Sequence, residues 1–301
     1  MQLSRLDGHT ILITGASSGI GYFIAEGLAQ LGATVVVAAR SAERARAAIA
    51  RLPGPGRHRH LPLDLSDRGS IRSAGAAVGD GAAIDGLIMN AGVIAASPVY
   101  AEGPFGVEST VDVNVVAHMD FLRLALPALR RSQHARIVST GSMLTRRIPF
   151  DAESWLAQTS YRPRVAYAMS KHAAEILGFE LDRRLVGSGS SIRSVVTHPG
   201  GAIDALTPDR IPLHRRPTAV RLVAPAIAPL VSRFVQGKDT AARSAIAAMA
   251  VAELPATAYI GPQRGATGEA AFTAPVPSSV DAALGARLWR EMEAILADSV
   301  L

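Results

Sequence analysis

The hydrophobic positions of the chain alternate between short continuous apolar runs and longer stretches with helical periodicity. The first run is Thr10–Thr14, and a helical pattern through Ile24, Leu28 and Leu31 follows it and ends at Gly32. Five further apolar runs lie at 34–38, 60–63, 84–89, 136–139 and 191–196. Near-continuous apolar strands that alternate with helices are typical of a parallel sheet covered on both faces. The pattern therefore predicts an α/β fold with a doubly wound, Rossmann-like parallel sheet flanked by helices.

The stretches between these runs predict the helices. They lie at 41–52, where Ser41 is the expected N-cap, from about 67, at about 103–131, from about 164, and at 280–296. No repeat with a period of 20 to 50 residues is present, and no linker divides the chain. We therefore expect residues 1–301 to form a single domain.

Two segments interrupt the alternation, at about 143–166 and 204–236. Both are longer than the usual connection between elements, and both follow the carboxyl end of a strand, where open α/β sheets bind ligands. We predict that they are insertions forming the walls of a substrate pocket. Their apolar side chains, among them Phe150 and Trp155, indicate an apolar substrate.

Composition restricts the classes of protein that remain. The chain has 301 residues, 49% of them hydrophobic, which is enough for a full-sized core. No apolar run reaches the length of a membrane span, and the first ten residues contain no apolar signal-peptide core. The chain has no cysteine, which excludes disulfides and thiolate metal sites. We expect a cytoplasmic protein without a membrane span.

The formal net charge is +6 and the pI is about 10.3. The arginines are scattered and are not interleaved with aromatic residues, so we expect no binding of nucleic acid and assign part of the excess charge to a small anionic ligand. His58 and His60 could begin a metal site, but no third ligand of a suitable type lies near them in the sequence, and we expect no metal.

A glycine-rich turn follows the first apolar run. Gly15, Gly19 and Gly21 stand between the predicted strand and the first helix, with the spacing G-x-x-x-G-x-G. In that position backbone N–H groups and the helix N-terminus can face a diphosphate. The predicted contacts from this turn to a dinucleotide are Gly15, Ser17, Ser18, Gly19, Ile20 and Gly21.

The end of the second predicted strand indicates which dinucleotide binds. An acidic residue there would hold a ribose 2′-hydroxyl, whereas an arginine suits a 2′-phosphate. The chain has Arg40 in that stretch and no carboxylate, which favours NADP(H) over NAD(H). Asp64 and Leu65, after the third strand, are placed to face the adenine, although Asp64 could equally cap the next helix.

Tyr167 and Lys171 stand four residues apart at the start of the helix from about 164. That spacing is about one helical turn, so both side chains leave the same face. Lysine is rare in this chain, because only Lys171 and Lys238 are lysines among its 31 Lys and Arg residues. Taken alone, the pair could equally be a surface lysine beside a half-buried tyrosine.

Read together, these motifs resemble the short-chain dehydrogenase/reductase family over about residues 5–205. The pattern comprises Thr14-Gly15, Gly19 and Gly21, then Asn90-Ala91-Gly92, Asn114, Ser142, Tyr167, Lys171 and Pro199-Gly200. The long step from Ser142 to Tyr167 is similar to that of the retinol-dehydrogenase-like branch, which carries an insertion there. The resemblance implies an enzyme that interconverts a carbonyl and an alcohol.

The resemblance also implies roles for these residues. Tyr167 would be the general acid–base, and Lys171 would hydrogen-bond the nicotinamide ribose and favour the phenolate form of Tyr167. Ser142 would position the substrate oxygen, and Asn114 would support a water-linked proton path from Lys171. Tyr167 would also contact the cofactor, and the remaining cofactor contacts would come from Asn90, Ala91, Gly92, Pro199 and Gly200.

Several alternatives stay open at this point. Ser139 competes with Ser142 for the substrate oxygen, although strand direction and the distance to Tyr167 favour Ser142. Asp204 stands where many family members have a threonine that binds the nicotinamide amide, which leaves that contact undecided. His198 is expected to be a hydrogen-bonding residue at a strand end and not a catalytic base.

The function and assembly also have alternatives. The rival to an enzyme is a catalytically silent NADP(H)-binding regulator or interaction protein on the same fold. By analogy with the family, a homodimer or homotetramer would form through the helices that start near 103 and 164.

Overall fold

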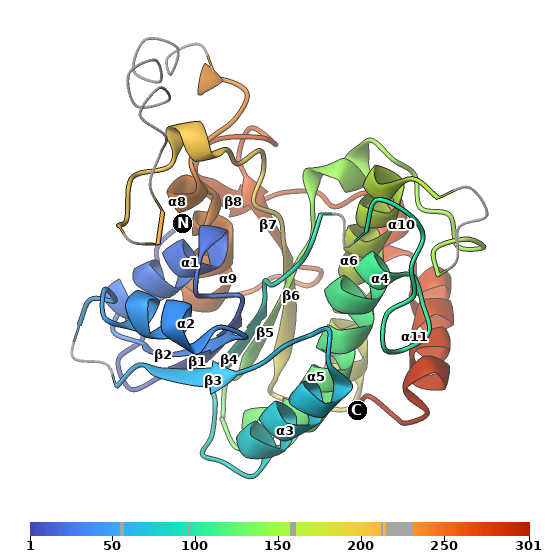
Figure 1. The fold of residues 1–301 in the computed structure, drawn as a ribbon, viewed down its shortest axis with the longest axis horizontal. Helices are drawn as coiled ribbons and strands as arrows, with labels where there is room; N and C mark the ends of the chain where they lie inside the picture. Colours follow the sequence, from blue (N-terminus) through green and yellow to red (C-terminus); the bar gives the residue numbers. More distant parts are fainter. Residues whose placement is uncertain (55–56, 95–96, 157–160, 212, 215–230) are drawn as a thin grey trace.

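The computed structural model describes residues 1–301 except 55–56, 95–96, 157–160, 212 and 215–230. Its centre is one eight-stranded sheet with the order β3-β2-β1-β4-β5-β6-β7-β8, in which only β8 is antiparallel (Figure 1). The strands are β1 Thr10–Thr14, β2 Thr34–Ala39, β3 Arg59–Pro62, β4 Gly86–Met89, β5 Arg136–Thr140, β6 Arg193–Thr197, β7 Tyr259–Pro262 and β8 Ala270–Phe272. The six predicted strands are β1 to β6, and the predicted doubly wound fold is confirmed.

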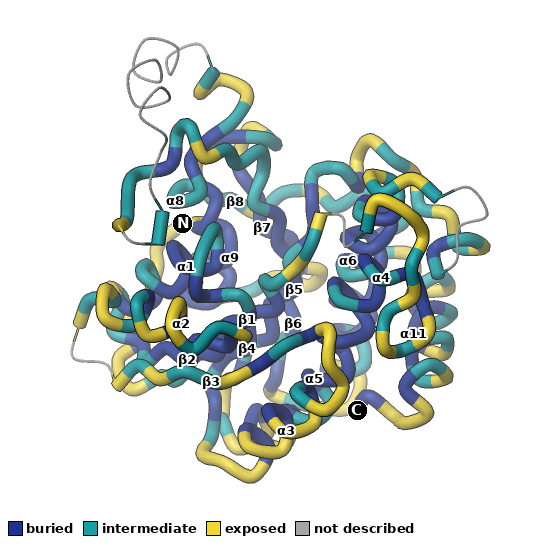
Figure 2. Tube along the Cα trace, in the orientation of Figure 1, coloured by how far each residue is buried: buried dark blue, intermediate teal, exposed yellow. Residues whose placement is uncertain are grey.

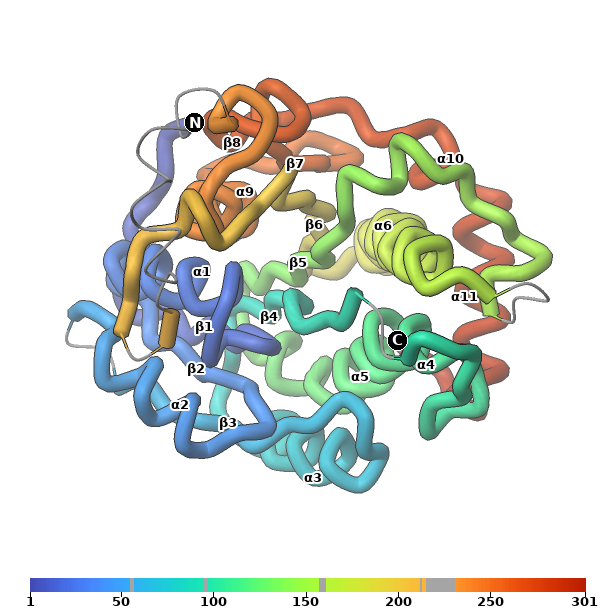
Figure 3. The backbone as a smooth tube through the Cα atoms, turned by 45° about the horizontal axis from the view of Figure 1, so that its top comes forward, coloured from blue at the N-terminus to red at the C-terminus, as the bar shows by residue number. Residues whose placement is uncertain are grey.

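Helices cover both faces of the sheet (Figures 1 and 3). The main ones are α1 Gly19–Gln30, α2 Ala42–Ile49, α3 Arg68–Gly79, α5 Ala117–Arg130, α6 Pro163–Gly187, α9 Arg243–Ala250 and α11 Ala282–Leu296. The short ones are α4 Ser109–Val111, α8 Lys238–Ala241 and α10 Pro277–Val280, together with 3₁₀ turns at Met143–Arg146 and Asp204–Leu206. None of the described helices is both long and apolar enough to cross a membrane.

Alternate side chains of the strands point to opposite faces and build two separate cores. Leu12 and Val36 pack with residues of α3, α5 and α6, whereas Ile11 and Val37 pack with residues of α1, α2 and α9. The inner strands are therefore buried on both sides, which favours apolar sequences, whereas the edge strands β3 and β8 are partly exposed (Figure 2).

After the second insertion, the sequence predicted the helix at 280–296, which is α11, but not the strands. Strands β7 and β8 are short, and β7 contains glycine and proline, so neither has a recognisable period. They are strands because β7 pairs with β6 in parallel and β8 then pairs with β7. Long-range pairing, and not local pattern, decides their structure.

The helix predicted at about 103–131 begins later and is irregular. Helix α4 starts at Ser109, and a π-helical segment at Asp112–Val116 connects it to α5. Residues before Ser109 are held out of the helix because the Asp112 carboxylate accepts a hydrogen bond from Phe105 N at 2.8 Å. The predicted start at Gly103 was therefore wrong.

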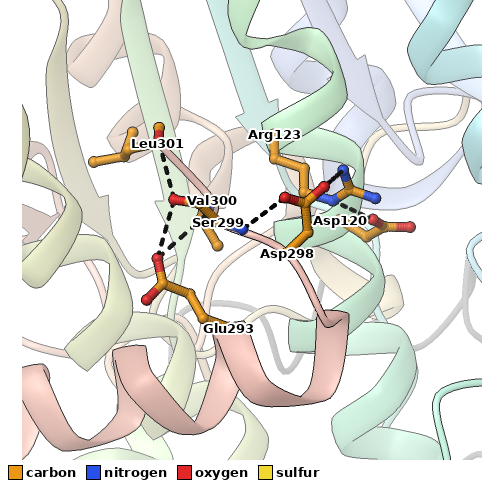
Figure 4. Close-up of polar contacts among 7 residues, drawn as sticks. All are labelled: Asp120, Arg123, Glu293, Asp298, Ser299, Val300 and Leu301. Atoms are coloured by element: carbon orange, nitrogen blue, oxygen red, sulfur yellow. Dashed lines mark hydrogen bonds and ion pairs between the residues drawn. The ribbon is translucent and has the colours of Figure 1, made fainter.

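The C-terminal residues fold back onto α5 (Figure 4). Arg123 donates to Asp120 at 2.7 Å and to Asp298 at 2.8 Å, and Ser299 donates to Glu293 at 3.3 Å. Helix α11 itself packs on α6, so it lies outside the helix layer that covers the sheet. This arrangement supports α6, which carries Tyr167 and Lys171.

Candidate active site

The glycine turn joins β1 to α1 at the point where the strand order reverses between β1 and β4. Gly15 has φ +71°, and a Cβ at Gly21 would lie 2.4 Å from Gly15 O and 2.5 Å from Asn90 Nδ2. The two glycines are needed for backbone packing between the turn and the Asn90-Ala91-Gly92 segment. Gly19 differs, because a Cβ there would meet nothing within 4 Å. Its position leaves room for a ligand.

The Gly21→Ala variant is expected to destabilise the protein by about 1–3 kcal/mol, because the added methyl group must displace the backbone of the turn. Gly19→Ala is the matched control: its Cβ has free space, and only its positive φ of +59° opposes the change, which costs roughly 1 kcal/mol. Thermal unfolding of both variants measures the difference. A Gly21→Ala protein as stable as wild type would contradict this packing.

A cleft of about 480 Å³ opens in front of the glycine turn. The predicted cofactor residues that line it are Gly15, Ser17, Ser18, Gly19, Ile20, Gly21, Arg40, Asp64, Leu65, Asn90, Ala91 and Gly92. Within the described part of the chain, the first turn of α1 carries no acidic residue and Ser18 makes no side-chain cap. The N–H groups there are thus free to face an anion, so the cleft fits the diphosphate of a dinucleotide.

Positive side chains line the end of this cleft beside β2. Arg40 and Arg44 are both exposed, and Arg44 N donates to Ser41, the predicted N-cap of α2. Burial raises the pKa of Asp64, but hydrogen bonds from Ser66 and the positive charge of Arg40 outweigh this and lower it. The N-cap of the next helix is Asp67, which accepts from Gly69 N at 2.7 Å. Asp64 is therefore not the cap of that helix.

Tyr167 and Ser142 meet at the carboxyl ends of β5 and β6, where α6 begins. Hydrogen bonding to Ser142 acts to lower the pKa of Tyr167, which indicates that the two side chains lie near each other. Ser139 points elsewhere, since its Oγ would lie 3.0 Å from a Cβ at Gly178 in the middle of α6. The geometry therefore places Ser142, and not Ser139, beside the phenol. Figure 3 looks almost along α6 and shows it beside the strand ends.

Burial raises the pKa of Tyr167 above its ordinary value of 10.0, and the hydrogen bond with Ser142 opposes this shift. The role of Lys171 in favouring the phenolate stays a prediction. In this structure Lys171 Nζ donates to Thr140 O at 3.0 Å. Burial lowers the pKa of Lys171 to about 8, while Glu175 acts to raise it.

Gly92 connects the lysine to the cleft. A Cβ at Gly92 would lie 3.0 Å from Asn114 Oδ1 and 3.3 Å from Lys171 Nζ. The Asn114 side chain accepts from Val93 N at 2.8 Å and donates to Val93 O at 2.9 Å and to Ser170 Oγ at 2.9 Å. Asn114 thus fixes the segment after Gly92 against α6. Sequence reasoning missed Ser170, although it stands inside the Y-x-x-x-K motif.

In the π-helical segment, the main-chain carbonyl of Asn114 lies 3.2 Å from His118 Nδ1. Since a carbonyl only accepts, Nδ1 carries the proton, and His118 Nε2 accepts from Thr14 Oγ1 at 3.0 Å. Thr14 Oγ1 in turn accepts from Asn90 N and Ala91 N, each at 3.0 Å. This buried network holds the Asn90-Ala91-Gly92 segment. His118 belongs to no recognised sequence motif, so sequence analysis could not have identified its role.

Glu175, one turn after Lys171, is fully buried. Its carboxylate accepts from Ser142 N at 3.3 Å, Tyr259 at 3.1 Å and Ser279 at 2.8 Å. Burial raises its pKa from 4.5 to about 7 against the opposing effect of these hydrogen bonds. Glu175 therefore ties the turn that carries Ser142 to β7 and to α10. A glutamate inside a helix gives no sequence signal for such a role.

The first predicted pocket insertion is anchored more tightly than expected. Trp155 is buried in the core and donates from Nε1 to Glu291 of α11 at 2.8 Å, so it is not an open pocket wall. The parts of the two insertions at 157–160, 212 and 215–230 lie outside the described residues.

His198 also differs from expectation. Its ring stacks on Tyr259, and neither ring nitrogen has a hydrogen-bond partner among the described residues. It is thus not the predicted hydrogen-bonding residue, because its side chain points into packed protein. His58 and His60 bond to backbone atoms of β2 or the preceding loop, and no group of three potential metal ligands is present in the described part of the chain.

Comparison with known proteins matches residues 9–208 to a family described as short chain dehydrogenase. The chain is 33% identical over 205 residues to human retinol dehydrogenase 13, covering 66% of this chain and 60% of that protein. It is 33% identical over 201 residues to polyprenol dehydrogenase of Mus musculus, covering 64% and 59%. The aligned segment thus spans about 60% of these relatives' length.

Two solved structures are similar over more of the chain. An uncharacterized protein from Mycobacterium paratuberculosis has a TM-score of 0.78 and 29% identity, covering all of this chain and 97% of its own. A short chain dehydrogenase from Burkholderia cenocepacia in complex with NADP has a TM-score of 0.62 and 28% identity, covering 87% and 99%.

Proposed function

The chain belongs to the short-chain dehydrogenase/reductase family, in its retinol-dehydrogenase-like branch, and on this basis we propose that it is an NADP(H)-dependent oxidoreductase. It interconverts a carbonyl and an alcohol on an apolar substrate. Asn114, Ser142, Tyr167 and Lys171 form its catalytic group.

One observation carries this proposal: the four residues lie in one connected group that reaches the cofactor cleft. Ser142 acts on the pKa of Tyr167, Ser170 bonds both the Tyr167 carbonyl and Asn114, and both Lys171 and Asn114 lie against Gly92, which lines the cleft. This contiguity supports the proposal that the Tyr167 phenol handles a proton near the dinucleotide, as hydride transfer to a carbonyl requires.

Each side chain has a physical role in the proposed reaction. The bound nicotinamide supplies or accepts the hydride. Tyr167, whose pKa lies above 10.0, is protonated at neutral pH and is ready to donate to a carbonyl oxygen. Ser142 donates to that same oxygen and orients it, and its turn is held by Glu175. The ammonium of Lys171 is available to the nicotinamide ribose. Pro199 and Gly200 are among the remaining cofactor contacts.

The preference for NADP(H) rests on Arg40 and Arg44, which line the cleft where the adenosine 2′-phosphate would lie. Arg40→Ala is expected to weaken NADPH binding about tenfold and to leave NADH binding unchanged, because only NADPH carries that phosphate. Titration of ligand fluorescence measures both affinities. Arg46→Ala removes an exposed arginine of α2 outside the cleft and serves as the control. An unchanged ratio of the two affinities would refute the preference.

The substrate class is proposed from the apolar residues of 143–166 and from the relatives, whose names assign retinol and polyprenol to those proteins. The test is consumption of NADPH with a series of aldehydes and ketones of increasing chain length, and of NADP⁺ with the matching alcohols. Turnover that rises with chain length supports the proposal. Tight NADPH binding without turnover on any member would favour the alternative, a catalytically silent regulator.

A further inference from the structure

The second lysine of the chain also lies at the cofactor cleft. Lys238 begins α8, lines the cleft in front of the glycine turn, and has a side chain that is 26% exposed. Its Nζ lies 2.5 Å from Asp204 Oδ1. We infer that Lys238 is a cofactor-binding residue that contacts the diphosphate of the dinucleotide. The inference rests on the proposed function in one respect, namely that the ligand is NADP(H).

The position of α8 assigns Lys238 to the diphosphate and not to the adenosine. Helix α8 packs against α1, as Figure 1 shows, and the first turn of α1 lines the cleft through Gly19, Ile20 and Gly21. Arg40 and Arg44 instead come from the end of β2 and from α2. The cleft therefore has two cationic regions on different elements.

These two regions match the two anionic groups of NADP(H). The adenosine 2′-phosphate would lie near the arginines, and the diphosphate at the glycine turn would lie near Lys238. Asp64, the acidic residue that lines the cleft, stands on the arginine side, since the charge of Arg40 acts on its pKa. Lysine binds a phosphate as a compact point charge, whereas arginine binds a carboxylate or a phosphate through two parallel hydrogen bonds.

Lys238 is held in place by the segment after β6. Its N–H donates to Thr207 Oγ1 at 3.0 Å, and Gln236 Nε2 donates to Pro199 O at 2.9 Å. A Cβ at Gly237 would lie 2.6 Å from Leu206 O, so only glycine permits this close approach. The predicted cofactor turn Pro199-Gly200 and Lys238 are thus parts of one rigid arrangement.

The ion pair also gives Asp204 a role. Its carboxylate is 59% exposed and faces Lys238 at 2.5 Å and His214 Nδ1 at 3.6 Å. On this inference, Asp204 orients the ammonium of Lys238, and the ion pair neutralises the carboxylate charge.

The experiment compares Lys238→Met with wild type by isothermal titration of NADPH and of adenosine 2′-monophosphate, which has the 2′-phosphate but no diphosphate. We expect about tenfold weaker binding of NADPH and unchanged binding of adenosine 2′-monophosphate, because one charge-assisted contact is lost. Added salt should weaken NADPH binding to wild type more than to the variant.

Arg243→Met is the matched control. Arg243 lies at the start of α9, pairs with Glu269 and is not among the residues that line the cleft. Its replacement by methionine lowers the net charge of the protein by the same amount as Lys238→Met. NADPH affinity equal to wild type in Lys238→Met would overturn the inference. So would an equal loss of affinity for NADPH and for adenosine 2′-monophosphate in Lys238→Met, or an equal loss of NADPH affinity in Lys238→Met and Arg243→Met. Wild-type protein that binds neither NADPH nor NADH would overturn the proposed function as well.

Discussion

Replacing Tyr167 with phenylalanine is expected to lower kcat for carbonyl reduction by about 10²–10⁴-fold, the range typical of a lost general acid. The phenyl ring keeps the packing of α6, while the hydroxyl that bonds Ser142 is removed. NADPH binding should stay close to wild type, because the cleft is built by the glycine turn, β2 and β4. Steady-state kinetics and NADPH titration on the same preparation separate the two effects.

Tyr22→Phe is the control for loss of a tyrosine hydroxyl. Tyr22 is buried in α1, and its hydroxyl donates to Glu26 at 3.0 Å and not to any residue of the catalytic group. Its turnover should equal that of wild type. If Tyr167→Phe retained full turnover as well, the proposed proton donor would be wrong. A loss of NADPH binding in Tyr167→Phe would instead assign the tyrosine to cofactor binding alone.

The parts of the fold that sequence predicted are those set by local pattern. Strands β1, β2 and β4 are continuous apolar runs because helices cover both faces of the sheet. The glycine turn is recognisable because backbone atoms approach closely at Gly21. Tyr167 and Lys171 share a helix, so their spacing alone predicts that they lie on one face.

Most of the parts that sequence did not predict depend on partners far along the chain. Strand β7 exists because it pairs with β6, where Tyr259 lies opposite Val196. The start of α4 at Ser109 has a local cause, because Asp112 holds the preceding turn through Phe105 N. Within the site, the partners are again distant. Lys238 reaches the cleft through contacts with 199–207, and Glu175 acts through Ser142 and Tyr259, which are 33 and 84 residues away. The local hydrophobic periodicity of the sequence carries no information about such contacts.

The second large effect is expected on stability, at Glu175. Glu175→Leu should lower the free energy of unfolding by about 3 kcal/mol, because Ser142 N, Tyr259 and Ser279 would lose a buried acceptor. Glu175→Gln keeps the shape and the acceptor oxygen and should cost less. Chemical denaturation at neutral pH measures both, and equal stability of Glu175→Leu and wild type would contradict the role of Glu175 in holding these elements.

The pH dependence of the free energy of unfolding separates the effect of the titrating Glu175 carboxyl group from the effect of the side chain's shape. The pKa of Glu175 rises from 4.5 to about 7 on folding because the group is buried. The folded protein thus holds a proton that the unfolded chain has released, so raising the pH through this window favours unfolding by up to ~3 kcal/mol. The wild-type free energy of unfolding should therefore decline between these two pH values relative to that of Glu175→Gln, which cannot titrate.

Other buried acids do not obscure this difference. Burial also raises the pKa of Asp112, to about 6, but Asp112 is present in both proteins, and its contribution cancels when the two curves are subtracted. Glu253→Gln, at an exposed position, should follow the wild-type curve. If wild type and Glu175→Gln declined in parallel, Glu175 would be ionised in the folded protein at acidic pH. Its charge would then face Lys171 one turn away throughout the neutral range, and the turn carrying Ser142 would be held by a carboxylate and not by a carboxylic acid.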